Sequence, residues 1–114
     1  KNYCIENNLE VPKTESDFAK VIYNSLSVWY KNAILEIENL TGKSYKSINI
    51  VGGGSNAQYL NKLTANATKK EVIAGPKEAT ALGNLVVQMI AENKFKDLSE
   101  ARKCIYNSFS LKKY

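Results

Sequence analysis

The chain has 114 residues and a formal net charge of +5, with 16 lysines and arginines against 11 aspartates and glutamates. Its hydrophobic content of 44% is that of a folded protein, and its length allows no more than one domain. The basic residues are spread along the chain instead of clustering with aromatics, and only Arg102 is an arginine. We therefore expect solvated lysines, including the pair Lys69-Lys70, and no nucleic-acid partner.

The chain contains no histidine and only two cysteines, Cys4 and Cys104. This composition excludes Ser-His and Cys-His nucleophile pairs and offers no pattern for a metal site. We expect two reduced thiols in a cytoplasmic protein, with a disulfide between them as the open alternative. No apolar run is long enough to cross a membrane, so no membrane partner is expected. The polar start lacks a signal-peptide core and an initiator methionine, so we expect the chain to begin inside a longer gene product.

The first elements in chain order are an irregular stretch over residues 1–13 and a long helix over residues 15–41. Thr14 is placed to cap this helix, with Asp17 as its partner, and Gly42 is placed to end it. Its apolar residues recur every three or four positions and predict one stripe, packed in a core: Phe18, Ile22, Leu26, Trp29, Ala33, Ile37 and Leu40. A helix of this length measures about 40 Å, which exceeds the diameter of a compact domain of this size. The length therefore favours a larger parent structure.

A strand is predicted over residues 47–51, followed by a turn and a helix that begins with Ser55 as N-cap and runs to about residue 68. A second strand covers residues 71–74. A third helix covers about residues 77–92 and contains Gly83, a residue that usually admits a close backbone neighbour. The capping box Asp97–Glu100 then opens a last helix.

This order of strand, helix and strand predicts a parallel pair covered on both faces. Two strands alone are marginal, so the sequence predicts a helix-rich piece of a larger α/β domain. The isolated piece is then expected to self-associate or to expose an apolar face.

Three consecutive glycines, Gly52, Gly53 and Gly54, stand between the first strand and its helix. Backbone N–H groups can approach a ligand closely there, and the following helix start favours an anion such as a phosphate. A purely structural turn is the alternative. The run through Ala57 also fits a dinucleotide-binding fingerprint, but the acidic residue required at the end of the next strand is missing. A P-loop is excluded because no Gly-Lys-Ser/Thr follows.

The stretch from Ala74 to Asn84 is the second unusual feature. Pro76 suits a first helical turn, and small residues make the helix thin, so its start could form one wall of a nucleotide cleft beside the glycine loop. Close packing of the helix on the sheet, without a ligand, is the alternative.

Together, the runs Ile50–Ser55, Leu60–Ala67 and Val72–Asn84 resemble the C-terminal part of the FGGY carbohydrate kinases, and the last run is most similar to the rhamnulokinase branch. The resemblance extends over the whole chain. It implies that residues 1–114 are the C-terminal part of the second, nucleotide-binding domain of a sugar kinase. The implied fold is α/β, a partial ribonuclease H-like (actin-like ATPase) domain that is helix-rich with two short strands.

The same resemblance implies the chemistry. ATP and a sugar lie between two domains in this family, with Mg²⁺ on the phosphates, and the rhamnulokinase branch phosphorylates L-rhamnulose in rhamnose catabolism. Gly52, Gly53, Gly54 and Ser55 would touch adenosine and phosphate, with Gly53 as the foremost candidate, and Asn56 would lie near the adenine. The catalytic aspartate, the phosphate loop and most sugar contacts would lie upstream, so no catalytic or metal-binding residue falls in this chain, which alone is expected to be inactive.

Two positions depart from the family pattern. Asn66 stands where many relatives have aspartate, and Lys69 stands where glycine is common at the helix end. Two rival hypotheses remain: an NAD-binding domain of the Rossmann type, and a non-enzymatic helical interaction module whose glycine loop is purely structural.

Overall fold

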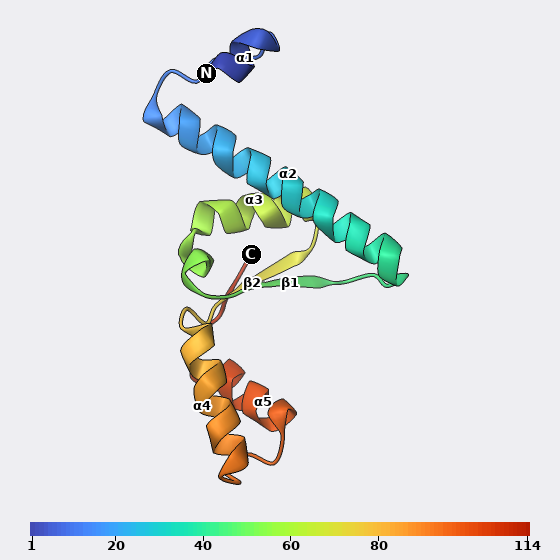
Figure 1. Cartoon of the computed structure of the whole chain (residues 1–114), viewed down its shortest axis with the longest axis vertical. Coiled ribbons are helices and arrows are strands. Elements are labelled where there is room, and N and C mark those ends of the chain that lie inside the picture. Colours follow the sequence, from blue (N-terminus) through green and yellow to red (C-terminus); the bar gives the residue numbers. More distant parts are fainter.

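A computed structural model describes all residues, 1–114. The molecule is elongated, with principal extents of 61 × 34 × 21 Å and a radius of gyration of 18.3 Å, where a compact domain of this length has about 13–14 Å. A long helix crosses over a shorter helix and a small sheet, and two further helices form a separate lower lobe (Figure 1). The elements in chain order are α1 (Asn2–Glu6), α2 (Glu15–Thr41), β1 (Ser47–Ile50), η1 (Gly53–Asn56), α3 (Gln58–Thr68), β2 (Glu71–Ala74), α4 (Ala79–Ala91), α5 (Leu98–Ser108) and β3 (Lys112–Lys113).

The long helix α2 has the predicted bounds because both ends are set by local capping. The Asp17 backbone N–H donates to Thr14 Oγ1 at 3.2 Å, and the Thr14 N–H donates to Asp17 Oδ2 at 3.0 Å. These bonds complete the capping box and hold the pKa of Asp17 below its ordinary value. At the other end, Gly42 adopts the predicted left-handed conformation with φ of +65°.

The sheet contains the predicted parallel pair and one further strand. Strand β1 pairs with β2 from Ser47↔Glu71 to Ile50↔Ala74, and α3 connects them. The strand order is β1-β2-β3, and β3 runs antiparallel to β2. The prediction of two strands was therefore incomplete, because a two-residue Lys-Lys strand carries no alternation of apolar and polar residues.

Several helix boundaries differ from the predictions. The short helix α1 lies within the stretch predicted to be irregular, α3 begins at Gln58 and not directly after Ser55, and α4 spans Ala79–Ala91. Lys69 ends α3 in the left-handed conformation, with φ of +57°, although it is not glycine. In the box that opens α5, Asp97 accepts from the Glu100 N–H at 2.9 Å, but the Glu100 carboxylate accepts from the Lys96 N–H and not from Asp97.

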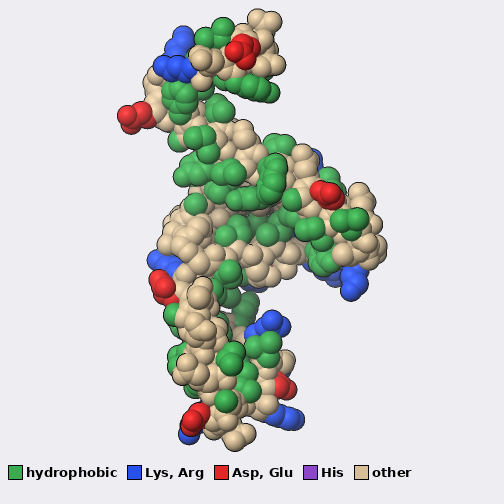
Figure 2. Space-filling view, viewed as in Figure 1, with side chains coloured by type: hydrophobic (Ala, Val, Ile, Leu, Met, Phe, Trp, Pro, Cys, Tyr) green, Lys and Arg blue, Asp and Glu red, His purple; other side chains and the backbone are tan.

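The apolar stripe predicted on α2 is largely exposed in this chain instead of packed in a core, which agrees with the expectation that the isolated piece exposes an apolar face. Trp29 is 67% exposed and Leu40 is 81% exposed. Figure 2 shows hydrophobic side chains gathered along α2 and across the middle of the molecule. The packed side of α2 faces α3 instead, where Ser27 is buried and the rings of Tyr23 and Tyr59 lie 5.8 Å apart.

The core is correspondingly small. Its buried apolar residues come from β2 and from the two helices of the lower lobe: Val72, Ala74, Val86 and Ala101. The close neighbour expected at Gly83 is also absent, because a side chain there would meet no atom within 4 Å. None of the helices combines the length and the apolar character that a membrane crossing requires.

Lys70 is an exception to the expectation of solvated lysines. Its ammonium lies 2.7 Å from Glu38 Oε1, and the two side chains are only 14% and 17% exposed. Lys70 also donates to the Tyr45 carbonyl, and the Tyr45 N–H donates to Glu38. The hydrogen bond from Lys70 holds the pKa of Glu38 below its ordinary value. This network ties the end of α2 to the start of β2 and so fixes β1, which leads to the glycine loop.

Candidate functional site

The glycine loop leaves β1 through a backbone conformation that only glycine adopts readily. Gly52 has φ of +78° and ψ of −166°. Its N–H donates to the Pro76 carbonyl at 3.0 Å, which holds the loop against the turn after β2. The next residues form the short 3-10 helix η1 instead of running directly into α3.

Ser55 lies inside this turn and does not cap α3, which corrects the sequence-based prediction. It is 6% exposed, and its hydroxyl donates to the Gly52 carbonyl at 2.7 Å. Its own carbonyl accepts from Asn61 Nδ2 at 3.0 Å. Asn61 is 1% exposed, and no role was predicted for it from the sequence. The signal that could have identified Asn61 is a polar residue on the buried side of a helix that follows a loop, because buried polar groups are normally hydrogen-bonded.

Gly53 and Gly54 present open backbone. A side chain added at either would meet no atom within 4 Å, and both residues are exposed. Neither N–H donates to another backbone group, as expected for the first positions of a helix. Two adjacent free N–H groups without side chains can donate hydrogen bonds to an anionic group.

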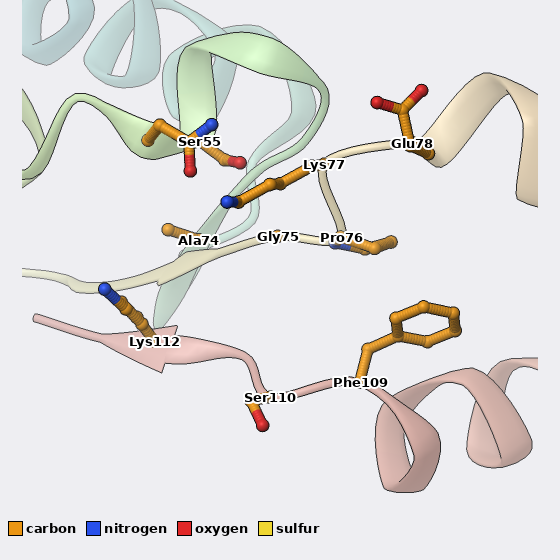
Figure 3. Close-up of a pocket in the computed structure, with 10 residues that line it drawn as sticks. Ser55, Ala74, Gly75, Pro76, Lys77, Glu78, Phe109, Ser110 and Lys112 are labelled. Carbon is orange, nitrogen blue, oxygen red and sulfur yellow. The ribbon is translucent and has the colours of Figure 1, made fainter.

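A cavity of about 340 Å³ lies beside this loop, and three segments that are distant in sequence form it (Figure 3). The loop contributes Ser55 and Asn56, the turn after β2 contributes Ala74–Glu78, and the C-terminal segment contributes Phe109, Ser110 and Lys112. The turn thus lies next to the glycine loop, which is the arrangement in which the helix start could form one wall of a cleft. The volume of the cavity, about 340 Å³, is at the lower end of the range for ligand pockets.

The five predicted site residues do not all face one space. Ser55 and Asn56 line the 340 Å³ cavity, and Gly52 packs against the turn. Gly53 faces outward, whereas Gly54 lines a second, mostly apolar cavity of about 270 Å³ on the side of α2 and β1. The loop thus separates two cavities.

The cavity wall carries charges that sequence reasoning did not place there. Lys77 and Lys112 line it together with one carboxylate, Glu78. Neither lysine takes part in an ion pair, whereas Lys113 lies 3.3 Å from Glu71. The neighbouring Glu71 carboxylate raises the pKa of Lys113 above its ordinary value. The surplus of unpaired ammonium groups favours an anionic ligand.

The sequence model of the FGGY family of carbohydrate kinases, C-terminal domain, matches residues 3–92. The chain belongs to the FGGY family. The resemblance read from the glycine loop and the Val72–Asn84 run is therefore confirmed, and the NAD-binding alternative is not favoured. The helix-rich model with its small sheet is consistent with the actin-like ATPase fold of the resemblance.

Individual relatives point to one branch of the family. The chain is 45% identical over all 114 residues to a rhamnulokinase of Halalkalibacterium halodurans and 46% identical to one of Oceanobacillus iheyensis, in each case covering 24% of the relative. It is 44% identical over 112 residues to a rhamnulokinase of Bacillus subtilis, covering 98% of this chain and 23% of that protein. The chain thus spans about a quarter of the length of the curated relatives that it matches.

The two kinds of match differ at the C-terminus. The family model ends at residue 92, whereas the first two rhamnulokinases match the whole chain. Helix α5 and strand β3 therefore belong to the part shared with these relatives outside the family match.

Proposed function

We propose that residues 1–114 are the C-terminal part of the second, nucleotide-binding domain of an ATP-dependent sugar kinase that phosphorylates L-rhamnulose. The membership in the FGGY family and the names of the relatives support the reaction class and the sugar. The single structural observation that carries the nucleotide role is the open backbone of Gly53 and Gly54, whose two N–H groups are free in the loop that also supplies Ser55 and Asn56 to the 340 Å³ cavity.

The residues present fit a nucleotide. In this proposal the backbone of Gly52–Ser55 lies along the adenosine and a phosphate, and Asn56 lies near the adenine. Because the Ser55 hydroxyl donates to Gly52, it offers a ligand only its lone pairs. Asn56 is exposed and lines the cavity, so its amide is free to contact a base.

The reaction is transfer of the γ-phosphoryl group of ATP to a sugar hydroxyl, with release of ADP. Such catalysis depends mainly on positioning and on electrostatic stabilisation of the phosphates, with Mg²⁺ bridging them. The chain has no group of three or more Cys, Asp or Glu side chains arranged to hold a metal ion. As the family resemblance implies, we assign nucleotide binding to this chain, and assign the carboxylate base and most sugar contacts to another part of the kinase.

A coupled assay that detects ADP tests this function in the full-length protein. With ATP, Mg²⁺ and L-rhamnulose we expect turnover that saturates in both substrates, and slower turnover with D-xylulose as the comparison sugar. Absence of turnover with every sugar would refute the kinase assignment, whereas turnover with D-xylulose alone would refute only the choice of substrate.

A further inference from the structure

The register of β3 against β2 directs two consecutive lysines to opposite faces of the sheet. Lys113 pairs with Ile73 in the ladder and reaches Glu71, two residues earlier on the same face of β2. Lys112 pairs with Ala74 and lines the cavity on the other face. Because Ala74 has a small side chain, it leaves the space into which the Lys112 side chain extends (Figure 3).

The C-terminal segment is held in place by specific contacts. The Tyr114 N–H donates to the Val72 carbonyl at 2.9 Å, and the Val72 N–H donates to the Tyr114 carbonyl at 3.0 Å. Next to the cavity, Gly75 has φ of +113°, and a Cβ there would lie only 3.1 Å from Leu111 Cδ2. Gly75 thus allows the segment to pack closely against the turn, and this packing fixes where Lys112 enters.

Two ammonium groups enter the cavity from different segments. Lys77 extends from the turn after β2 toward Ser55 of the glycine loop, whereas Lys112 extends from β3 on the side of β2 that faces β3 (Figure 3). Ser55 and Asn56 of the glycine loop line the same cavity as these lysines, so a phosphate group of a nucleotide that enters the cavity from the loop would face them. Glu78 is the single carboxylate in the wall, so one positive charge remains uncompensated.

We propose that the segment Phe109–Lys112 is a wall of the nucleotide site and that Lys112 binds a phosphate group of the nucleotide. This inference rests on the proposed function, because it assumes a nucleotide at the glycine loop. It assigns a binding role to residues beyond the family match, which ends at residue 92, within the part shared with the rhamnulokinases. In this proposal Lys112 is the residue by which this chain favours phosphate-bearing ligands over adenosine.

The test uses calorimetry on the full-length protein with ADP, adenosine and inorganic phosphate as ligands. For Lys112→Gln we expect about tenfold weaker ADP binding, the size of one lost charge-assisted hydrogen bond, with adenosine binding unchanged. Lys112→Arg keeps the charge and should restore most of the ADP affinity. Lys103→Gln is the matched control, because Lys103 is an exposed lysine of α5 without an ion pair.

Three results overturn the inference in distinguishable ways. If Lys112→Gln binds ADP as the wild type does, Lys112 has no role while the proposed function stands. If ADP and adenosine weaken equally, the segment only shapes the base pocket and contributes no phosphate contact. If the wild-type protein binds ADP no better than inorganic phosphate, both the inference and the proposed function fail. Circular dichroism of each variant confirms that the fold is retained.

Discussion

Replacing Gly53 should separate a nucleotide-binding loop from a structural turn, because the fold itself tolerates a side chain there. A Cβ at Gly53 meets no atom within 4 Å, and its backbone lies outside the left-handed region. We therefore expect the free energy of unfolding of Gly53→Val to stay within about 0.5 kcal/mol of wild type. Gly52→Val is the contrast, since its glycine-only conformation makes a side chain cost about 1–3 kcal/mol of stability.

Although the fold tolerates a side chain at Gly53, nucleotide binding should not. A side chain at Gly53 would keep the nucleotide away from the free N–H groups and leave buried polar groups unpaired, at a cost of about 1–3 kcal/mol. This corresponds to roughly 5- to 150-fold weaker ATP binding, the largest loss expected from one replacement in the loop that leaves the fold intact.

Calorimetry with ATP on the full-length protein measures this loss, and chemical denaturation measures the stability. Lys62→Ala is the control, because Lys62 is exposed on α3 and has no ion pair, whereas Lys70 is bound to Glu38. A folded Gly53→Val variant that binds ATP as tightly as Lys62→Ala would show that the loop is only a structural turn.

Three further predictions concern the chain as a whole. The isolated 114-residue chain should show no ATP-dependent phosphorylation of L-rhamnulose in a coupled assay, because the carboxylate base lies elsewhere in the proposed kinase; robust turnover would contradict this. The isolated chain should also sediment as an oligomer or bind an apolar dye, because Trp29 and Leu40 are largely exposed; a monomer without dye binding would refute the prediction. Finally, the hydrogen bond from Lys70 lowers the pKa of Glu38 below its ordinary value of 4.5. The ionised carboxylate therefore stabilises the folded state at pH values above 4.5, and this contribution disappears as the pH falls through the lowered pKa. Denaturation at neutral and acidic pH should therefore show that acidification costs Glu38→Gln less stability than it costs the wild type. Glu36→Gln, on the exposed side of α2, is the control and should lose as much as the wild type. Equal losses in all three proteins would disprove the role of the pair.

Elements set by local chemistry could be predicted from the sequence, and elements set by distant contacts could not. Thr14, Asp17 and Gly42 fix the ends of α2 within a few residues of themselves, so the bounds of that helix were predicted correctly. Strand β3 exists because Tyr114 pairs with Val72, about forty residues earlier in the chain, and no local pattern reports this pairing.

The candidate site shows the same division. The glycine loop and the turn at Pro76 carry recognisable residues, so both were singled out from the sequence, and their hydrogen bond appeared in the folded chain. The position of Lys112 in the cavity depends on the register of β3, so it appeared only in the folded chain. Ser55 was misassigned as a cap because its hydroxyl turns back to the Gly52 carbonyl, an option that a conformation unique to glycine opens.

The exposed surface of α2 bears on the proposal that this chain is part of a larger domain. Besides the stripe through Trp29 and Leu40, three residues spaced by seven positions are also exposed on another side: Val21, Val28 and Leu35. The helix thus exposes apolar side chains beyond the side that packs against α3, and exposed apolar patches of this kind mark interfaces. Strand β1 lies at an edge of the sheet beneath the same helix, with one side open to another strand. One additional layer of structure along β1 would cover both surfaces, which supports a kinase domain that extends beyond these 114 residues.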